Sequence, residues 1–468
     1  MRKVSLVVAL VVLGGLAATS FADVQNIRLS GDIRTRGYWL NNAGDDGAGD
    51  QNSGTTAFID QRTRVSVEAD LEDHVLVVVT LKAQGLWGTE NSTSDTSGAG
   101  TGFSGSSTDA INKGWDTGVD EAYVQLNEMF YTPATVKIGR QYLMYGRGLI
   151  LSSVDQEYNF DAARLVLDYY PLTLDFVFAE LVNNQSFGST SSSAGAVDLL
   201  FVNGRYEIAD SPLKNVEGYF GWVAQGSSGP TSALSVPPTD PFFGPAVPTG
   251  ASPWIVGGRI DLGLTETLTT SIEAAYEGGA GGAATANGIS AYIVQVSGRW
   301  AAKDKSMSPS INWGSTWASG GGEGQDPTDP DSIGAGQFIP WFDYQDGYNG
   351  YIFCPLLSNI HIVNLGGSIR PYENTTFSVQ GYWYRKMDSN SPAGSNPNLD
   401  FGGISGWDAG PGQNLGVEID GILGYDYSKD VRLQLVYGAF IPGNAYKNVD
   451  TYGAATVQEV RGEINVKF

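Results

Sequence analysis

Residues 64–71 read Arg-Val-Ser-Val-Glu-Ala-Asp-Leu, with polar and apolar side chains in strict alternation. A period of two is typical of a β-strand that has one apolar and one polar face. The same alternation recurs over 377–383, 415–426 and 460–468, and no segment of comparable length keeps a helical period. The pattern predicts an all-β chain. It does not separate a soluble sandwich from a membrane barrel, because both alternate.

The first 22 residues have the features of a secretory signal peptide. Arg2 and Lys3 precede an apolar run over 4–18, and Ser20-Phe21-Ala22 offers a small-x-small cleavage site. The apolar run is shorter than the ~20 residues of a membrane-spanning helix, which disfavours the alternative of an N-terminal anchor. We expect residues 1–22 to be removed on export, leaving 23–468 as a single domain.

The lengths of the connections between strands favour a membrane barrel. Eight short links are predicted near 72–74, 128–134, 170–171, 209–212, 263–266, 302–305, 371–374 and 427–430. Nine mostly longer links alternate with them, near 40–56, 88–117, 143–160, 184–196, 226–253, 278–288, 320–357, 387–414 and 441–456. Short periplasmic turns alternating with long extracellular loops are typical of outer-membrane barrels. The count predicts a transmembrane antiparallel β-barrel of about 18 strands in the bacterial outer membrane.

Composition excludes several other classes of protein. The 468 residues carry a formal charge of −23, which becomes −25 without Arg2 and Lys3 and argues against a nucleic-acid partner. A single cysteine, Cys354, excludes an internal disulfide, and two histidines leave little for a zinc site or a catalytic triad. Neither a G-x-S-x-G elbow nor a Ser-His-Asp constellation is evident, so we expect no enzyme activity, with a lipase-like barrel as the alternative.

The chain ends in an alternating strand that finishes on the aromatic Phe468. Terminal strands of this kind resemble the signal read by the outer-membrane barrel assembly machinery, which we therefore expect as a partner. Interfacial girdles should be formed by aromatic residues near strand ends. The candidates are Trp39, Trp87, Tyr169, Trp222, Trp254, Tyr276, Trp300, Trp383, Tyr425 and Tyr437.

Several motifs resemble the alginate-export family of outer-membrane porins. Residues 136–141 (Val-Lys-Ile-Gly-Arg-Gln) lead into Tyr-Gly-Arg at 145–147 and then Asn-Phe-Asp-Ala-Ala-Arg at 159–164. Phe-Ile-Pro-Trp-Phe at 338–342 and the strand at 415–420 also resemble that family. The resemblance runs from about residue 26 to the C-terminus. It implies an eighteen-stranded porin whose basic conduit carries a polyuronate.

Taking the apolar phase of each strand as lipid-facing, the opposite phase defines the expected lumen. Its basic residues are Arg34, Arg36, Arg62, Arg64, Lys82, Lys137, Arg164, Arg259, Arg299, Arg370 and Arg461, accompanied by Asp32, Glu68, Glu121, Asp168, Glu273, Glu418, Asp420 and Glu463. Arginine offers planar bidentate donors to carboxylate or phosphate, so a basic constriction would pass anions. The alternative is that these charges pair across the lumen and brace the wall. Arg140 falls on the lipid-facing phase, and we expect a bulge near Gly139 or a rim position to turn it inward.

Acidic residues concentrate in the predicted long loops. Asp326, Asp329 and Asp331 are candidates for a Ca²⁺ or Mg²⁺ site, and no other cofactor is expected. The alternative is a solvated, repulsive loop surface, since the calcium-loop spacing is missing.

The sequence therefore predicts a monomeric porin, embedded in outer-membrane lipid, that passes an anionic solute or polysaccharide. A general diffusion porin and a structural or surface-interaction barrel with cation-binding loops stay open as alternatives. The sequence also leaves open whether the loops at 88–117 or 320–357 fold inward as plugs.

Overall fold

The computed structural model describes residues 26–42, 55–71, 74–88, 115–153, 159–182, 197–225, 251–281, 288–302, 307–321, 335–342, 349–355, 357–389, 412–447 and 455–468. Within these ranges no helix is long and apolar enough to cross a membrane. The helical segments described are a single turn at α2 (Asn444–Lys447) and a 3₁₀ turn at Met129–Tyr131.

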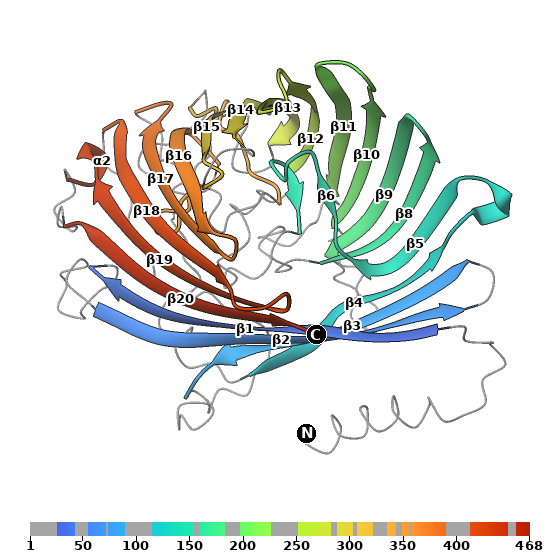
Figure 1. The fold of residues 1–468 in the computed structure, drawn as a ribbon. Helices are drawn as coiled ribbons and strands as arrows, with labels where there is room; N and C mark the ends of the chain where they lie inside the picture. Colours follow the sequence, from blue (N-terminus) through green and yellow to red (C-terminus); the bar gives the residue numbers. More distant parts are fainter. Residues whose placement is uncertain are drawn as a thin grey trace, which may run out of the picture.

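Eighteen strands form one antiparallel sheet in which each strand pairs with its neighbours along the chain. They are β1 (Asn26–Asn41), β2 (Thr55–Leu71), β3 (Val75–Leu86), β4 (Asp116–Leu126), β5 (Ala134–Gln141), β8 (Phe160–Tyr169), β9 (Leu172–Val182), β10 (Val197–Glu207), β11 (Leu213–Gln225), β12 (Ala251–Gly263), β13 (Leu268–Gly281), β14 (Ile289–Ala301), β15 (Ser310–Ala318), β16 (Ile360–Tyr372), β17 (Thr375–Lys386), β18 (Asn414–Asp426), β19 (Val431–Pro442) and β20 (Val457–Lys467). The last strand pairs with the first, from Asp32 opposite Lys467 to Asn41 opposite Gln458, and this closes the barrel. Figure 1 shows the ring of strands with blue β1 beside red β20.

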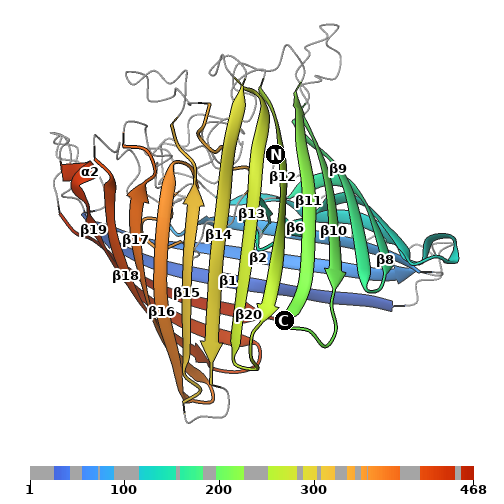
Figure 2. The same ribbon diagram turned by 90° about the horizontal axis from the view of Figure 1, so that it is seen from above.

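The predicted number of strands and the alternation of connections are confirmed. Each predicted short link joins two consecutive strands at one end of the barrel. Figure 2 shows several of these turns at the lower end of the strands. Both the start of β1 and the end of β20 lie at this end, which we call the periplasmic end. Two further strands, β6 (Met144–Tyr145) and β7 (Leu151–Ser152), form a separate small hairpin inside the long link between β5 and β8.

Alternation along each strand sorts its side chains between the two faces of the wall. In β13, Glu273, Ala275 and Glu277 are buried, whereas Ala274 and Tyr276 between them are exposed. Most of the predicted girdle aromatics lie on the exposed outer face, including Trp39, Trp222 and Trp383. This apolar outer surface is what a barrel presents to lipid.

The barrel closes next to the C-terminus. Gly31 and Phe468 exchange two backbone hydrogen bonds of 2.9 and 3.0 Å. A Cβ atom on Gly31 would lie 2.6 Å from the Phe468 ring, so the small residue allows the terminal aromatic to pack on the wall. Recognition of this strand by the assembly machinery stays a prediction.

A hydrophobic core fills part of the barrel interior. It joins inward-facing wall residues such as Phe201 and Ile293 to side chains from two long links. The link between β5 and β8 contributes Leu143 and Leu151, and the link between β15 and β16 contributes Trp341. The second link thus folds inward over its described residues, 335–342 and 349–355. The first link also folds inward, and Figure 1 shows its strand β6 inside the ring. Most of the loop at 88–117 lies outside the described residues.

One β-bulge changes the phase of β4. The register between β3 and β4 slips between Thr80 and Leu81, so Asp120 is the extra residue opposite them. As a result Asp120 and its neighbour Glu121 both face inward. The expected bulge near Gly139 is wrong, because β5 keeps a continuous register with β4 and with β8 through Gly139. Arg140 therefore stays on the outer face beside exposed Ile138, where its guanidinium lies 3.8 Å from the Asp161 carboxylate.

Candidate functional site: the barrel interior

Six of the predicted basic residues gather on one arc of the inner wall, made of β20, β1, β2 and β3. They are Arg34, Arg36, Arg62, Arg64, Lys82 and Arg461. Arg36 Nε lies 2.9 Å from Glu463 Oε2, and Arg62 Nη2 lies 3.7 Å from Asp32 Oδ2. Arg461 Nε bonds Glu459 at 2.8 Å, and its guanidinium lies over the rings of Tyr38 and Tyr351 at 5.1 and 4.8 Å. This arc, which we call the paired wall, places arginine and carboxylate side by side.

Asp120, the bulged residue, is a hub for this arc. Its carboxylate lies 3.7 Å from Arg64 Nη1 and 3.5 Å from Lys82 Nζ. It also accepts hydrogen bonds from Asn159 Nδ2 at 3.0 Å and from the Tyr142 hydroxyl. Burial and the adjacent Asp120 carboxylate raise the pKa of the Tyr142 phenol well above its ordinary value, so it acts as a neutral donor. Both ends of the link between β5 and β8 are thus fixed to β4.

Two more predicted arginines are held by an aspartate on the wall. Arg164 Nε donates to both carboxylate oxygens of Asp175 on the neighbouring strand, at 3.1 and 2.9 Å. Arg259 Nε makes the same two-oxygen contact with Asp261 on its own strand, at 3.0 and 3.1 Å. For these two residues the wall-bracing interpretation describes the geometry better than an open binding site does.

Buried carboxylates of the wall hold the inward segment over its described residues, 335–342 and 349–355. Glu277 is fully buried and accepts bonds from Ile339 N at 2.9 Å and Trp341 Nε1 at 2.8 Å. Glu418, also fully buried, accepts the backbone N–H groups of Tyr351, Ile352 and Phe353 at 2.6, 2.9 and 2.8 Å. This corrects the expectation that Glu418 lines the open pore, because the inward segment covers it. Phe353 then stacks on Phe440 with ring centroids 4.6 Å apart.

A second pair of carboxylates holds the hairpin of β6 and β7. Glu217 on β11 accepts Gly146 N at 3.0 Å, and Glu273 on β13 accepts Arg147 N at 3.0 Å. The hairpin in turn pairs with the other inward segment, through Ser152 N to Phe342 O at 2.6 Å and Phe342 N to Ile150 O at 2.9 Å. The two inward segments are therefore one connected body fastened to the wall.

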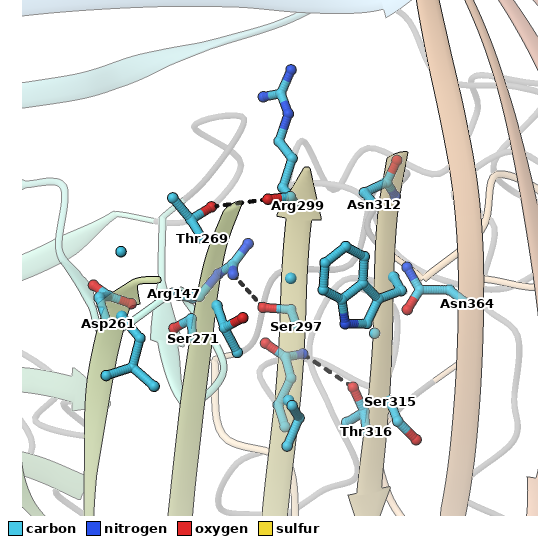
Figure 3. Close-up of a pocket in the computed structure, with 18 of the residues that line it drawn as sticks. Arg147, Asp261, Thr269, Ser271, Ser297, Arg299, Asn312, Ser315, Thr316 and Asn364 are labelled. Atoms are coloured by element: carbon cyan, nitrogen blue, oxygen red, sulfur yellow. Dashed lines mark hydrogen bonds between the residues drawn. The ribbon is translucent and has the colours of Figure 1, made fainter. Parts of the chain in front are cut away.

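Below this body, toward the periplasmic end, lies a cavity of about 1090 Å³. Its lining on β13 to β17 is rich in uncharged hydrogen-bonding side chains, including Ser271, Gln295, Ser297, Asn312, Thr316, Asn364 and Gln380. We call this arc the amide wall. Asn312 and Gln380 exchange two hydrogen bonds of 2.9 and 3.2 Å, so their orientation is fixed. Figure 3 shows Asn312 and Asn364 on one side of the cavity and Asp261 on the other.

Arg299 and Arg370 continue the lining toward the periplasmic end. Both border a second cavity of about 580 Å³, and Arg299 with Thr269 borders both cavities. Within the part of the chain that the structure describes, neither guanidinium makes an ion pair. These two predicted residues are therefore separate from the paired wall and keep their charge available in the cavity.

The remaining candidates are placed as follows. Glu121 faces inward near Lys137, whose ammonium lies 3.5 Å from the centroid of the Tyr123 ring. Asp168 lies at the periplasmic end of β8, where Thr173 Oγ1 donates to it at 3.2 Å. Asp326, Asp329 and Asp331 lie outside the described residues. Among the residues described, no cluster of three or more acidic, histidine or cysteine side chains is arranged to hold a metal ion.

The alternation along the strands did not predict that Arg147 and the amide wall line the lumen. Arg147 belongs to a loop and has no strand phase to place it, yet it lines the larger cavity. The amides and hydroxyls carry no charge, and a search for basic residues passes over them. The inward phase of β14 and β15, read for hydrogen-bonding groups, would have found Gln295, Ser297 and Asn312.

The sequence of this chain also matches a known protein family. The family described as "Alginate export" matches residues 25–457, nearly the whole chain. The chain belongs to the alginate-export family. Comparison with curated protein sequences gave no match.

Solved structures agree on the fold. OccK2 (OpdF) of Pseudomonas aeruginosa aligns with a TM-score of 0.55 at 11% identity, covering 95% of this chain and 98% of that one. OccAB3 of Acinetobacter baumannii aligns with a TM-score of 0.54 at 10% identity, over 94% and 99%. The outer membrane protein OprD of P. aeruginosa gives 0.53 at 12% identity, over 96% of both chains. The architecture of this alginate-export family member is that of an outer-membrane porin-type channel.

Proposed function

We propose that this protein conducts an anionic, polyhydroxylated solute of the uronate class across the outer membrane. The observation that carries the proposal is the lining of the two cavities. Arg299 and Arg370 have no ion pair within the described residues and stand beside the neutral amide wall. Guanidinium groups bind carboxylates through parallel N–H donors, and amides and hydroxyls suit sugar hydroxyls.

The division of the interior into two arcs supports this assignment. On the paired wall, carboxylates already contact arginines, so their fields partly cancel there. On the opposite side, the basic groups without an ion pair in the described residues (Arg147, Lys214, Arg299 and Arg370) outnumber the acidic ones (Asp210 and Glu266), and the amide wall is neutral. A solute with carboxylates and many hydroxyl groups matches that side better than a cation does, because like charges in a confined pore repel.

Two further points indicate the uronate class. The family is described by export of alginate, a polyuronate. A structural neighbour, OccK2, has been solved in complex with glucuronate, with a TM-score of 0.53 over 95% of this chain. Neither observation specifies the direction of transport in this protein.

The proposal is tested with purified protein in planar bilayers. Oligomers of galacturonate should block the ion current at lower concentrations than neutral glucose oligomers of the same length, and glucosamine oligomers should block least. This order of block is the expected result, because basic groups outnumber acidic ones among the unpaired charges that line the cavities. A general diffusion porin would instead show equal block by the three series at equal length, and that result would overturn the assignment.

A further inference from the structure

We propose that Arg147, carried into the lumen by the β6–β7 hairpin, is the cation that binds the carboxylate of the passing solute, and that Glu217 and Glu273 position it. This inference rests on the proposed function and names a specificity-determining residue for it. The charge on Arg147 is available even though two carboxylates lie next to it, because both accept backbone N–H groups of the hairpin.

The hairpin contacts those carboxylates through its backbone, not through the guanidinium. Glu217 Oε1 accepts Gly146 N and Glu273 Oε2 accepts Arg147 N, each at 3.0 Å. The Tyr219 hydroxyl donates to the other Glu273 oxygen at 3.1 Å. Adjacent peptide N–H groups therefore satisfy one oxygen of each carboxylate. Successive backbone N–H groups often bind an anionic ligand in this way, but here the anions are carboxylates of the barrel wall.

The turn that delivers these N–H groups requires glycine. Gly146 has a φ of +60°, in the left-handed region that other residues rarely adopt. A Cβ atom at this position would lie 2.2 Å from Glu273 Oε1. Any side chain would thus force either the Glu273 carboxylate or the hairpin to shift, and both shifts disturb the hydrogen bond to Arg147 N. The position of Arg147 depends directly on this close approach.

The guanidinium of Arg147 extends away from the carboxylates. It donates to the Ser297 hydroxyl on β14, and it lines the larger cavity together with Arg299, two residues further along that strand (Figure 3). Asp261 lines the same cavity but is held by Arg259 and by Asn215 Nδ2 at 2.7 Å. Within the described residues Arg147 makes no ion pair, and Glu217, Glu273 and Asp261 already have other partners. Asp210 and Glu266 also line the cavity, among the residues of its periplasmic end.

The position of the guanidinium suits binding more than bracing. Arg147 lies at the boundary between the inward body and the cavity, because it belongs to the hairpin and also lines the cavity. A neutral partner such as Ser297 is easily exchanged for a carboxylate, because a charge-assisted bond is the stronger one. Arg299 lies next along the path toward the periplasmic end, so a polymer could contact both in turn.

The test measures block of single-channel current by a galacturonate trimer. Removing the charge in Arg147→Gln should raise the half-blocking concentration about tenfold, since a charge-assisted hydrogen bond of this strength is lost. Arg147→Lys should recover part of that affinity, and Arg140→Gln, which removes an arginine from the outer face, should leave it unchanged. Wild-type affinity in Arg147→Gln would overturn the inference.

The positioning role has its own readout. Gly146→Ala and Glu273→Gln should raise the half-blocking concentration for the charged trimer while leaving block by a neutral glucose trimer at its wild-type concentration. A merely structural role would change both probes together, and that result would overturn the positioning role. Gel mobility before and after heating identifies folded barrels for every variant.

If the wild type itself showed no preference for the anionic trimer, the proposed function would fail, whereas a wild-type preference kept in Arg147→Gln would refute this inference alone.

Discussion

Arg259 and Arg299 both face the barrel interior, but only Arg259 has a carboxylate two residues away along its strand. Residues i and i+2 of a strand share a face, so Asp261 is placed to capture Arg259, and Glu459 likewise captures Arg461. The corresponding neighbours of Arg299 are Ser297 and Ala301. This local spacing explains the pairs made within one strand, whereas Arg164 and Arg36 are paired by Asp175 and Glu463 on neighbouring strands.

Substitutions at the periplasmic end should alter the rate at which an anion enters. In the Arg299→Gln, Arg370→Gln double variant, the on-rate of block by galacturonate trimer should fall several-fold, and more strongly at low salt, because rim charges act through long-range attraction. The measurement is single-channel block kinetics at two ionic strengths, with Arg140→Gln as the matched control. An on-rate equal to that of the wild type at low salt would contradict the role given to these two arginines.

At the scale of elements, the inward segments act as one body fastened by four wall carboxylates. Glu217 and Glu273 hold the β6–β7 hairpin, and Glu277 and Glu418 hold the inward segment at 335–342 and 349–355. Each carboxylate faces inward from a strand and accepts backbone N–H groups from the body. Buried N–H groups without acceptors are costly, so these contacts keep the segments inside the lumen.

Releasing one fastening should enlarge the pore. In Glu277→Ala, Ile339 N–H and Trp341 Nε1–H lose their acceptor, at a cost of about 1–3 kcal/mol each. We expect a higher single-channel conductance and a noisier open current, together with faster proteolysis of the loop in the folded barrel. The control is Glu128→Ala, which removes an exposed acid from a periplasmic turn. Unchanged conductance and proteolysis in Glu277→Ala would show that the segment is held by other contacts.

Strands and turns were predictable because their signals are local. Alternation over 64–71 and the position of each short link depend on neighbouring residues, and β2 and the eight turns follow them. The inward segments were not predictable in this way. Their apolar residues at 338–342 read as a loop motif, and the acceptors that fix them lie on distant strands. The bulge at Asp120 is also set by pairing across strands, which a single segment does not reveal.

At the scale of the whole molecule, the net charge of −23 is a poor guide to the interior. Acidic groups of the inner wall contact arginines on one arc or backbone N–H groups under the inward body. The charges that line the cavities without an ion pair in the described residues are mostly basic: Arg147, Lys214, Arg299 and Arg370, against Asp210 and Glu266. An acidic protein can thus enclose a conduit that favours anions.

The reversal potential of the reconstituted channel under a KCl gradient tests this central claim most directly. The free guanidinium groups should make chloride more permeant than potassium, and the preference should weaken as salt concentration rises because the charges are screened. A reversal potential of the sign expected for anion permeation is the predicted result. A potential of the opposite sign, showing potassium as the more permeant ion, would contradict the account.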